Sequence, residues 1–264
     1  MVKKSTAKKI FRTFDRNFTA MEKIISYPIS IISLLLFLLT IVIFHPIQWV
    51  CFNLFGYQAH KKSVDYLNFI LLRIGHLLGT TYKVENRESI PEGVPIIFVA
   101  NHQSLYDIIG IIWFLRKFHP KFVSKKELGK GIPSISFNLN HGGSVLIDRK
   151  DPKQAISVIK ELGQYIERTN RSAVIFPEGT RSKTGKPKEF AKSGLKILCK
   201  YAPSAYVVPI TINNSWKFVK FGFLPFGLGN RITFTVHKAI PVKGSDSEEL
   251  TNEVEAIIIK SIKA

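Results

Sequence analysis

Short apolar runs alternate with amphipathic stretches from residue 81 onward. The apolar runs predict buried strands, and the stretches with an apolar residue at every third or fourth position predict helices. The predicted strands are residues 82–84, 96–100, 121–126, 144–147, 173–176, 206–211 and 231–237, and the predicted helices are residues 108–115, 152–169, 189–201 and 246–263. This alternation predicts an α/β fold with a mixed, largely parallel sheet flanked by helices.

The N-terminal part of the chain has a different pattern. Asp, Glu, Lys and Arg are absent from Ile24 to Ala59, and a membrane span needs roughly 20 apolar residues. The gap is therefore too long for one span and barely long enough for two, and His45-Pro46 is expected to interrupt it. Basic residues flank both borders, which favours the cytoplasmic side for both. We predict a membrane-embedded two-helix element; two short spans are the alternative.

A second amphipathic stretch, residues 61–80, predicts a helix that packs this element onto the body, and Gly79-Thr80 ends it. The chain then divides into two predicted parts. Residues 1–80 form a basic N-terminus with a membrane-associated helical hairpin, and residues 81–264 form the α/β domain. A buried helix of a soluble protein is the structural alternative for the apolar segment, but its length and basic flanks favour a membrane.

Charge narrows the choice of partners. Lys and Arg number 38 against 19 Asp and Glu, which gives a net charge of +19. A surplus of this size implies an anionic partner, such as nucleic acid, phospholipid headgroups or phosphorylated substrates. Cys51 and Cys199 are the two cysteines of the chain, so neither a disulfide framework nor a structural zinc site is indicated.

A histidine and an aspartate flank the junction between strand 96–100 and the helix that follows. Five residues apart on one continuous helix, His102 and Asp107 would lie on different faces, so a contact needs the turn that this junction supplies. Asp107 on the Nδ1–H of the ring would fix the tautomer and leave Nε2 free to take a proton. The alternative is structural, because Ser104 and Asp107 also fit a capping box, in which Asp107 only caps the helix.

Charged residues also follow three other predicted strands. Lys125, Arg149 and Arg181 each lie at a strand end, where ligands bind in open α/β sheets, and cations there suit a phosphate group. Taken singly, each is more often a solvated surface charge. Glu178 precedes Gly179, which permits close backbone approach; the structural alternative for Glu178 is an ion pair with Arg181.

These clusters contain a base but no side-chain nucleophile. Gly142 to Leu146 fails the GxSxG pattern at its last position, and Gly179 to Lys186 has the wrong spacing for a phosphate-binding loop. Cys199 lies on a lysine-rich predicted helix, but a buried structural thiol is the more usual role. A base alone suits direct transfer, in which an acceptor hydroxyl is deprotonated and attacks an activated carbonyl.

Four segments together resemble the motifs of the glycerolipid acyltransferase family. Residues 101–107, NHQSLYD, resemble the HX4D motif; residues 145–149 are similar to the second motif, residues 176–182, FPEGTRS, to the third, and residues 208–210 to the fourth. The four segments occur in the same order as the motifs of the family, and the resemblance covers roughly residues 75–215. The second motif usually opens with Phe, where Val145 or Leu146 stands here.

The resemblance implies 1-acyl-sn-glycerol-3-phosphate acyltransferase activity, with an N-terminal two-helix element embedded in the membrane. By position, His102 would be the base on the glycerol hydroxyl, and Asp107 would orient it. Other residues at the strand ends would hold the phosphate and the glycerol. These are Lys125, Arg149, Glu178, Gly179, Thr180 and Arg181.

The resemblance also implies the partners. Lysophosphatidic acid would be the acceptor, acyl-CoA or acyl carrier protein the co-substrate, and a phospholipid membrane the site of action, at its cytoplasmic face (the inner membrane of a bacterium). No cofactor, metal or nucleic acid is expected. Two alternatives stay open: the same chemistry on glycerol 3-phosphate or another lysophospholipid, and a non-catalytic basic protein that binds membrane surfaces or nucleic acid, which only the net charge supports.

Overall fold

The computed structural model of the protein describes residues 2–87 and 90–263. The helices are α1 Val2–Leu77, α2 Tyr106–Phe114, α3 Ile135–His141, α4 Pro152–Thr169, α5 Ser193–Tyr201 and α6 Ser247–Lys260. The strands are β1 Thr81–Glu85, β2 Ile96–Ala100, β3 Pro120–Lys125, β4 Val145–Ile147, β5 Ser172–Ile175, β6 Tyr206–Asn213, β7 Arg231–Val236 and β8 Ile240–Pro241. The elements alternate as the hydrophobic pattern predicts.

All the strands belong to one sheet, in the order β1-β7-β6-β2-β5-β3-β4, with β8 beside β6. Strands β6, β2, β5, β3 and β4 run parallel to one another. Strand β7 is antiparallel to β6, and β1 is parallel to β7, so this edge runs in the opposite direction. The prediction of a mixed, largely parallel sheet flanked by helices is confirmed.

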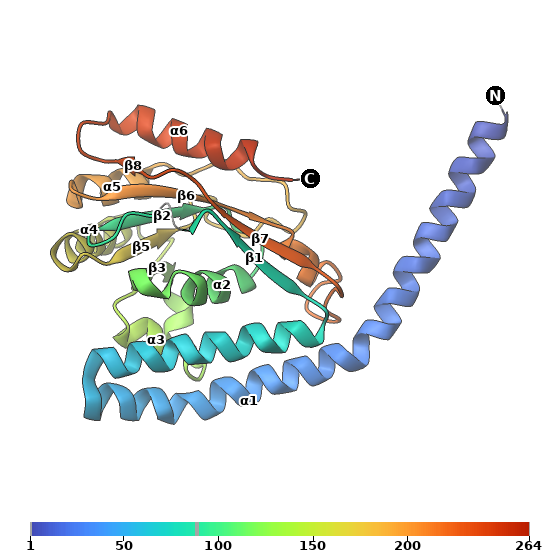
Figure 1. Ribbon diagram of the computed structural model, residues 1–264, viewed down its shortest axis with the longest axis horizontal. Coiled ribbons are helices and arrows are strands. Elements are labelled where there is room, and N and C mark those ends of the chain that lie inside the picture. The colour runs from blue at the N-terminus through green and yellow to red at the C-terminus, as the bar shows by residue number, and fades with distance from the viewer. Residues whose placement is uncertain (1, 88–89, 264) are drawn as a thin grey trace.

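Side chains of β2 alternate between two hydrophobic cores, as the period of a strand requires. Ile97 and Val99 join the core formed with α4, α5 and α6 on one face of the sheet. Phe98 and Ala100 join the core that includes Ile111 of α2 on the opposite face. Because every residue of β2 is buried, it reads as an unbroken apolar run, which is typical of a central parallel strand. Helices therefore cover both faces of the sheet (Figure 1).

Helix α1 forms a further layer beyond α2 and doubles back on itself (Figure 1). The backbone is non-helical at Gly56, with φ 76° and ψ −169°, and separates a first arm from a return arm. Ile41 of the first arm packs with Leu67 and Leu71 of the return arm and with Ile109 of α2. This contact attaches both arms to the body of the protein.

The predicted interruption at His45-Pro46 is wrong, because Pro46 lies inside the helical first arm. The chain reverses eleven residues after His45, at Gly56, where glycine tolerates a positive φ that other residues rarely adopt. The return arm therefore contains the helix predicted at 61–80, and the two arms meet at Gly56 instead of at His45-Pro46. Packing on the neighbouring arm and on the body offsets the hydrogen bond that proline removes.

The outer side of the first arm is apolar and exposed. Soluble proteins rarely expose so large a contiguous apolar surface. Among the described residues, one helix, Met21–Leu77, is long and apolar enough to cross a membrane. Its embedding in a membrane, and the division of the chain into two domains at residue 80, stay predictions. The exposed side chains are Ile24, Ile31, Ile32, Leu35, Leu38, Leu39, Val42, Ile43, Ile47, Trp49, Val50, Leu54 and Phe55.

Candidate active site

The predicted site residues follow strands β2, β5, β3 and β4, which are neighbours in the sheet and run in the same direction. Their carboxyl ends therefore meet at one edge. His102 lies two residues after β2, and the loop 176–182 follows β5 directly beside it. Lys125 ends β3, and Arg149 lies two residues after β4, one and two strands further along. The tertiary fold thus brings the first three family-like segments and Lys125 to a common edge, whereas residues 208–210 lie within β6.

The His102 ring and the Asp107 carboxylate are in direct contact. Nδ1 of His102 lies 2.9 Å from Oδ2 of Asp107. The loop between β2 and α2 makes this contact possible, as predicted, because it places His102 before the first turn of the helix and Asp107 within it. A carboxylate can only accept, so Nδ1 carries the proton and the free nitrogen is Nε2. The His102 side chain is 14% exposed and Asp107 is fully buried.

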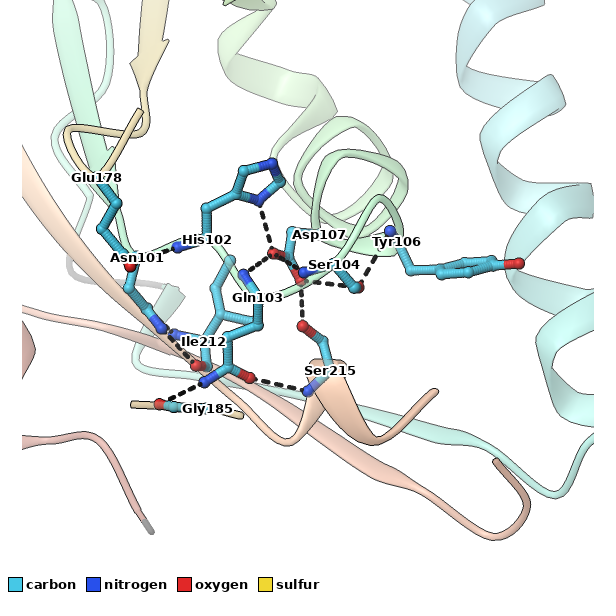
Figure 2. Close-up of polar contacts among 10 residues, drawn as sticks. All are labelled: Asn101, His102, Gln103, Ser104, Tyr106, Asp107, Glu178, Gly185, Ile212 and Ser215. Carbon is cyan, nitrogen blue, oxygen red and sulfur yellow. Dashed lines mark hydrogen bonds and ion pairs between the residues drawn. The ribbon is translucent and has the colours of Figure 1, made fainter. Parts of the chain in front are cut away.

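Several donors fix the Asp107 carboxylate in place (Figure 2). Oδ2 accepts hydrogen bonds from the backbone amides of Gln103 at 2.7 Å and Ser104 at 2.9 Å. Oδ1 accepts from the hydroxyl of Ser215 and, at 3.4 Å, from that of Ser104. The amide of Tyr106 in turn donates to the Ser104 hydroxyl. Asp107 therefore fits both the capping and the catalytic interpretation, because its carboxylate accepts hydrogen bonds from the amides before the helix and from the imidazole.

Strand β6 supplies partners that sequence reasoning missed. Ser215 follows this strand and, besides holding Asp107, donates its backbone amide to Oε1 of Gln103 at 3.0 Å. Asn101 pairs with the backbone of Ile212 through both its amide oxygen and its amide nitrogen. The residues lie more than 100 positions apart in the chain, and only the adjacency of β2 and β6 would have indicated them. The loop that carries His102 is thus bonded to the neighbouring strand on one side.

Glu178 bonds the same loop to the other neighbouring strand. Its Oε1 accepts the backbone amide of His102 at 2.8 Å, and its Oε2 accepts that of Lys188 at 2.9 Å. Burial raises the pKa of Glu178, and the two amides oppose part of that rise. The ion pair with Arg181 that the structural alternative predicted is not formed among the described residues. The ring of Phe176 stacks on the His102 imidazole at 4.1 Å.

The predicted phosphate-binding cations are exposed. Lys125, Arg149 and Arg181 make no hydrogen bond or ion pair with His102 or Asp107 in the part of the chain that the structure describes. Their roles in binding stay predictions. In the described part of the chain none of these three cations pairs with a carboxylate, so each is available to bind an anion.

Thr180 and Gly179 are the other predicted site residues in the loop that follows β5. Thr180 accepts a hydrogen bond from the Lys188 ammonium at 2.7 Å. Gly179 has a φ of 64° and open space where a side chain would stand. Cys199, on α5, is buried away from this edge, and burial raises the pKa of its thiol to about 12. This thiol is therefore structural, and the His102–Asp107 pair carries the candidate chemistry.

The sequence profile of the Acyltransferase family matches residues 81–213. A chloroplastic 1-acyl-sn-glycerol-3-phosphate acyltransferase of Arabidopsis thaliana is 31% identical over 180 residues, which are 68% of this chain and 48% of that protein. The 1-acyl-sn-glycerol-3-phosphate acyltransferase of Helicobacter pylori is 39% identical over 144 residues, 52% of this chain and 58% of that protein. This chain thus matches about half the length of these curated relatives.

A solved structure has the same fold. The crystal structure of the 1-acyl-sn-glycerophosphate acyltransferase PlsC from Thermotoga maritima superposes with a TM-score of 0.75 and 26% identity. The superposition covers 91% of this chain and 96% of that one. The profile match runs from the start of β1 to the end of β6 and includes His102, Asp107 and Glu178. On this evidence, the protein belongs to the acyltransferase family.

Proposed function

We propose that the protein is a membrane-bound O-acyltransferase that acylates the sn-2 hydroxyl of 1-acyl-sn-glycerol 3-phosphate and produces phosphatidic acid. The observation that carries this proposal is the contact between His102 and the buried Asp107 carboxylate. It supplies an oriented base at an edge lined with free cations. The relatives named as 1-acyl-sn-glycerol-3-phosphate acyltransferases support the choice of reaction.

The first step is attack by the acceptor. Nε2 of His102 takes the proton of the sn-2 hydroxyl while the oxygen attacks the carbonyl carbon of the acyl thioester. A C–O bond forms, and the carbonyl electrons move to its oxygen. Asp107 stabilises the imidazolium through the hydrogen bond at Nδ1. Because the attack is direct, no acyl-enzyme and no nucleophilic side chain are needed.

The second step releases the thiol. The tetrahedral intermediate collapses, the C–S bond breaks, and the thiolate takes the proton from Nε2 of His102. The ester and the free thiol of coenzyme A or acyl carrier protein leave, and the imidazole returns to its starting form. The Asp107 contact and the Phe176 stack keep the ring in one orientation through both proton transfers.

Cations at the strand ends would position the acceptor. Lys125, Arg149 and Arg181 would hold its phosphate, with Glu178 shaping the loop that carries the base. Arginine suits this role because its planar guanidinium binds two phosphate oxygens at once. Thr180 and Gly179 lie next to Arg181 and would contact the glycerol or phosphate. The acidic donor, acyl-CoA or acyl carrier protein, would approach the same basic edge.

An acceptor panel tests the reaction class. Purified protein with a labelled acyl thioester is expected to acylate lysophosphatidic acid in preference to glycerol 3-phosphate and lysophosphatidylcholine. Arg149→Gln is expected to raise the KM for lysophosphatidic acid about tenfold or more, because it removes a charge-assisted hydrogen bond to phosphate. Initial rates over a range of acceptor concentrations measure both effects.

The control is Arg73→Gln, which removes an arginine that lies on the return arm of α1 against Phe69. Its KM for lysophosphatidic acid should equal that of the wild type. Preferred acylation of glycerol 3-phosphate or of a neutral lysolipid would contradict the proposed acceptor while leaving the acyl chemistry in place. Absence of transfer to any acceptor would contradict the chemistry.

We also propose that the exposed apolar side of α1 embeds in a membrane, with the active-site edge on the cytoplasmic side. The double variant Leu35→Lys/Leu39→Lys places two charges on that side, and a charged side chain within the hydrocarbon region costs about 2.5–3.5 kcal/mol or more. Sedimentation with phospholipid vesicles is expected to fall at least about tenfold.

Ile156→Lys is the matched control for this experiment. Ile156 is also an exposed aliphatic residue, but it lies on α4, on the opposite face of the sheet. This variant should sediment with vesicles like the wild type. Equal vesicle binding by the α1 double variant would contradict embedding through α1.

A further inference from the structure

A second polar cluster lies at the opposite end of β3 from the candidate active site. The return arm of α1, the start of β3 and the residues before β4 enclose a pocket of about 370 Å³, part of which is open to solvent. Its lining includes His60, Lys61, Asp65, His119 and Lys121. Lys121 is the second residue of this strand and Lys125 ends it. Four residues of extended chain place the two about 13 Å apart.

Lys121 is the most unusual residue of this pocket. It is 6% exposed, and its ammonium has no hydrogen-bond or ion-pair partner among the described residues. Its Nζ lies 4.9 Å from the centroid of the Tyr57 ring. Burial, together with the charges of Arg171 and Lys61, lowers the pKa of Lys121 to about 7. A buried ammonium without a counter-ion is costly, so an anion in the pocket would relieve it.

Positive charges outnumber carboxylates around Lys121. The Arg171 guanidinium lies 3.9 Å from the centroid of the same Tyr57 ring. Lys61 is paired with Asp65, which is the one acidic side chain lining the pocket. His60 is 1% exposed, and neither of its ring nitrogens has a partner. Two lysines and an unpartnered imidazole therefore line a pocket with a single carboxylate, and Arg171 adds a third positive charge beside Tyr57.

We propose that this pocket binds a phosphate group. An excess of positive charge over carboxylates suits an anion that accepts from several sides, and phosphate oxygens accept strongly. The site is separate from the active-site edge, because it lies at the opposite end of the parallel strand β3 from Lys125.

The phosphate of an anionic phospholipid headgroup is the favoured source. Tyr57 follows Gly56 directly, and His60 lies four residues after that glycine. The residues before the turn, Leu54 and Phe55, are apolar and exposed. The charge-free segment ends here, at Lys61. Chain that leaves a hydrocarbon layer meets the headgroup phosphates first. A bound headgroup would connect the return arm of α1 to β3 at the membrane surface.

Binding to the full-length protein in a neutral detergent tests this site. Inorganic phosphate, dihexanoyl phosphatidylglycerol and dihexanoyl phosphatidylcholine are titrated by calorimetry. Lys121→Met is expected to weaken the binding of an anionic ligand at least about tenfold, because one charge-assisted hydrogen bond is lost. Without ligand, the same variant should melt at a higher temperature than the wild type, since a buried charge is replaced by a methylene chain of similar shape.

Three further variants test whether the anion binds in the pocket around Lys121. Lys83→Met removes the same charge from β1 and should bind as the wild type does. Arg149→Gln alters the proposed active-site cations and should retain the Lys121-dependent binding. Lys61→Gln leaves Asp65 unpaired in the pocket and should also weaken binding about tenfold, which covers the case in which Lys121→Met does not fold.

The same titrations distinguish a lipid headgroup from a soluble phosphate as the ligand. Tighter binding of phosphatidylglycerol than of inorganic phosphate supports a headgroup, and equal or tighter binding of inorganic phosphate supports a soluble anion at the same site. The proposal is overturned if the wild type binds neither anion, or if Lys121→Met and Lys61→Gln both bind as the wild type does.

Discussion

Substituting His102 by alanine is expected to lower kcat/KM for acyl transfer by about 10³-fold or more. A positioned general base contributes about 10²–10⁴-fold, and this base also returns the proton to the leaving thiolate. The fold should survive, because the ring makes one side-chain hydrogen bond and one stack with Phe176. Single-turnover rates with labelled thioester, together with melting temperatures, measure the two effects separately.

His76→Ala is the matched control for this prediction. His76 lies on the return arm of α1, and its ring hydrogen-bonds to the carbonyl of Leu72 and contacts the Tyr82 ring. Its removal should leave turnover within about twofold of the wild type. If His102→Ala retains turnover within tenfold of the wild type and remains folded, His102 is not the base.

Asp107→Asn is expected to lower kcat about 10³-fold while leaving the KM values of both substrates nearly unchanged. The asparagine amide cannot accept from His102, Gln103, Ser104 and Ser215 as the carboxylate does, so the imidazole loses its fixed tautomer. Because Asp107 is fully buried, unfolding should also become easier by at least about 2 kcal/mol. Steady-state kinetics and denaturant titration measure the two effects.

Ser215→Ala distinguishes positioning from general destabilisation. It removes one donor to Oδ1 of Asp107 but leaves the His102 contact at Oδ2 intact. A loss in kcat of about tenfold is expected, between the wild type and Asp107→Asn. A rise in KM with unchanged kcat in either variant would show that the carboxylate shapes substrate binding and does not orient the base.

The fold could be predicted where local pattern and burial coincide. Strand 96–100 is apolar throughout because both faces of β2 are covered, and helix α4 shows its period because one face packs on the sheet. Helix α3 was not predicted. It is seven residues long, from Ile135 to His141, with Ser, Asn and His among them, so neither periodicity nor propensity marks it. Its contacts with α1 and β4 hold it in place.

The position of the turn in α1 also could not be predicted from the local sequence. Proline at position 46 is the stronger local signal for a helix break, yet the helix continues through it and reverses at Gly56. Packing decides between the two positions, because Ile41 and Leu71 can meet only if the arms are long enough to lie side by side. The tendency of a proline to break a helix is worth a few kcal/mol at most, and the packing between the arms outweighs it.

The sequence by itself determined the alternation of strands and helices, the His102–Asp107 spacing and the basic, apolar character of the N-terminal part. These are local properties, and they follow from residue type and periodicity. Only the tertiary structure decided that Ser215 and Glu178 hold the base from either side, and that Lys121 is buried without a counter-ion. The physical reason is that strand order and packing bring together residues far apart in the chain, and no local pattern records which strands become neighbours.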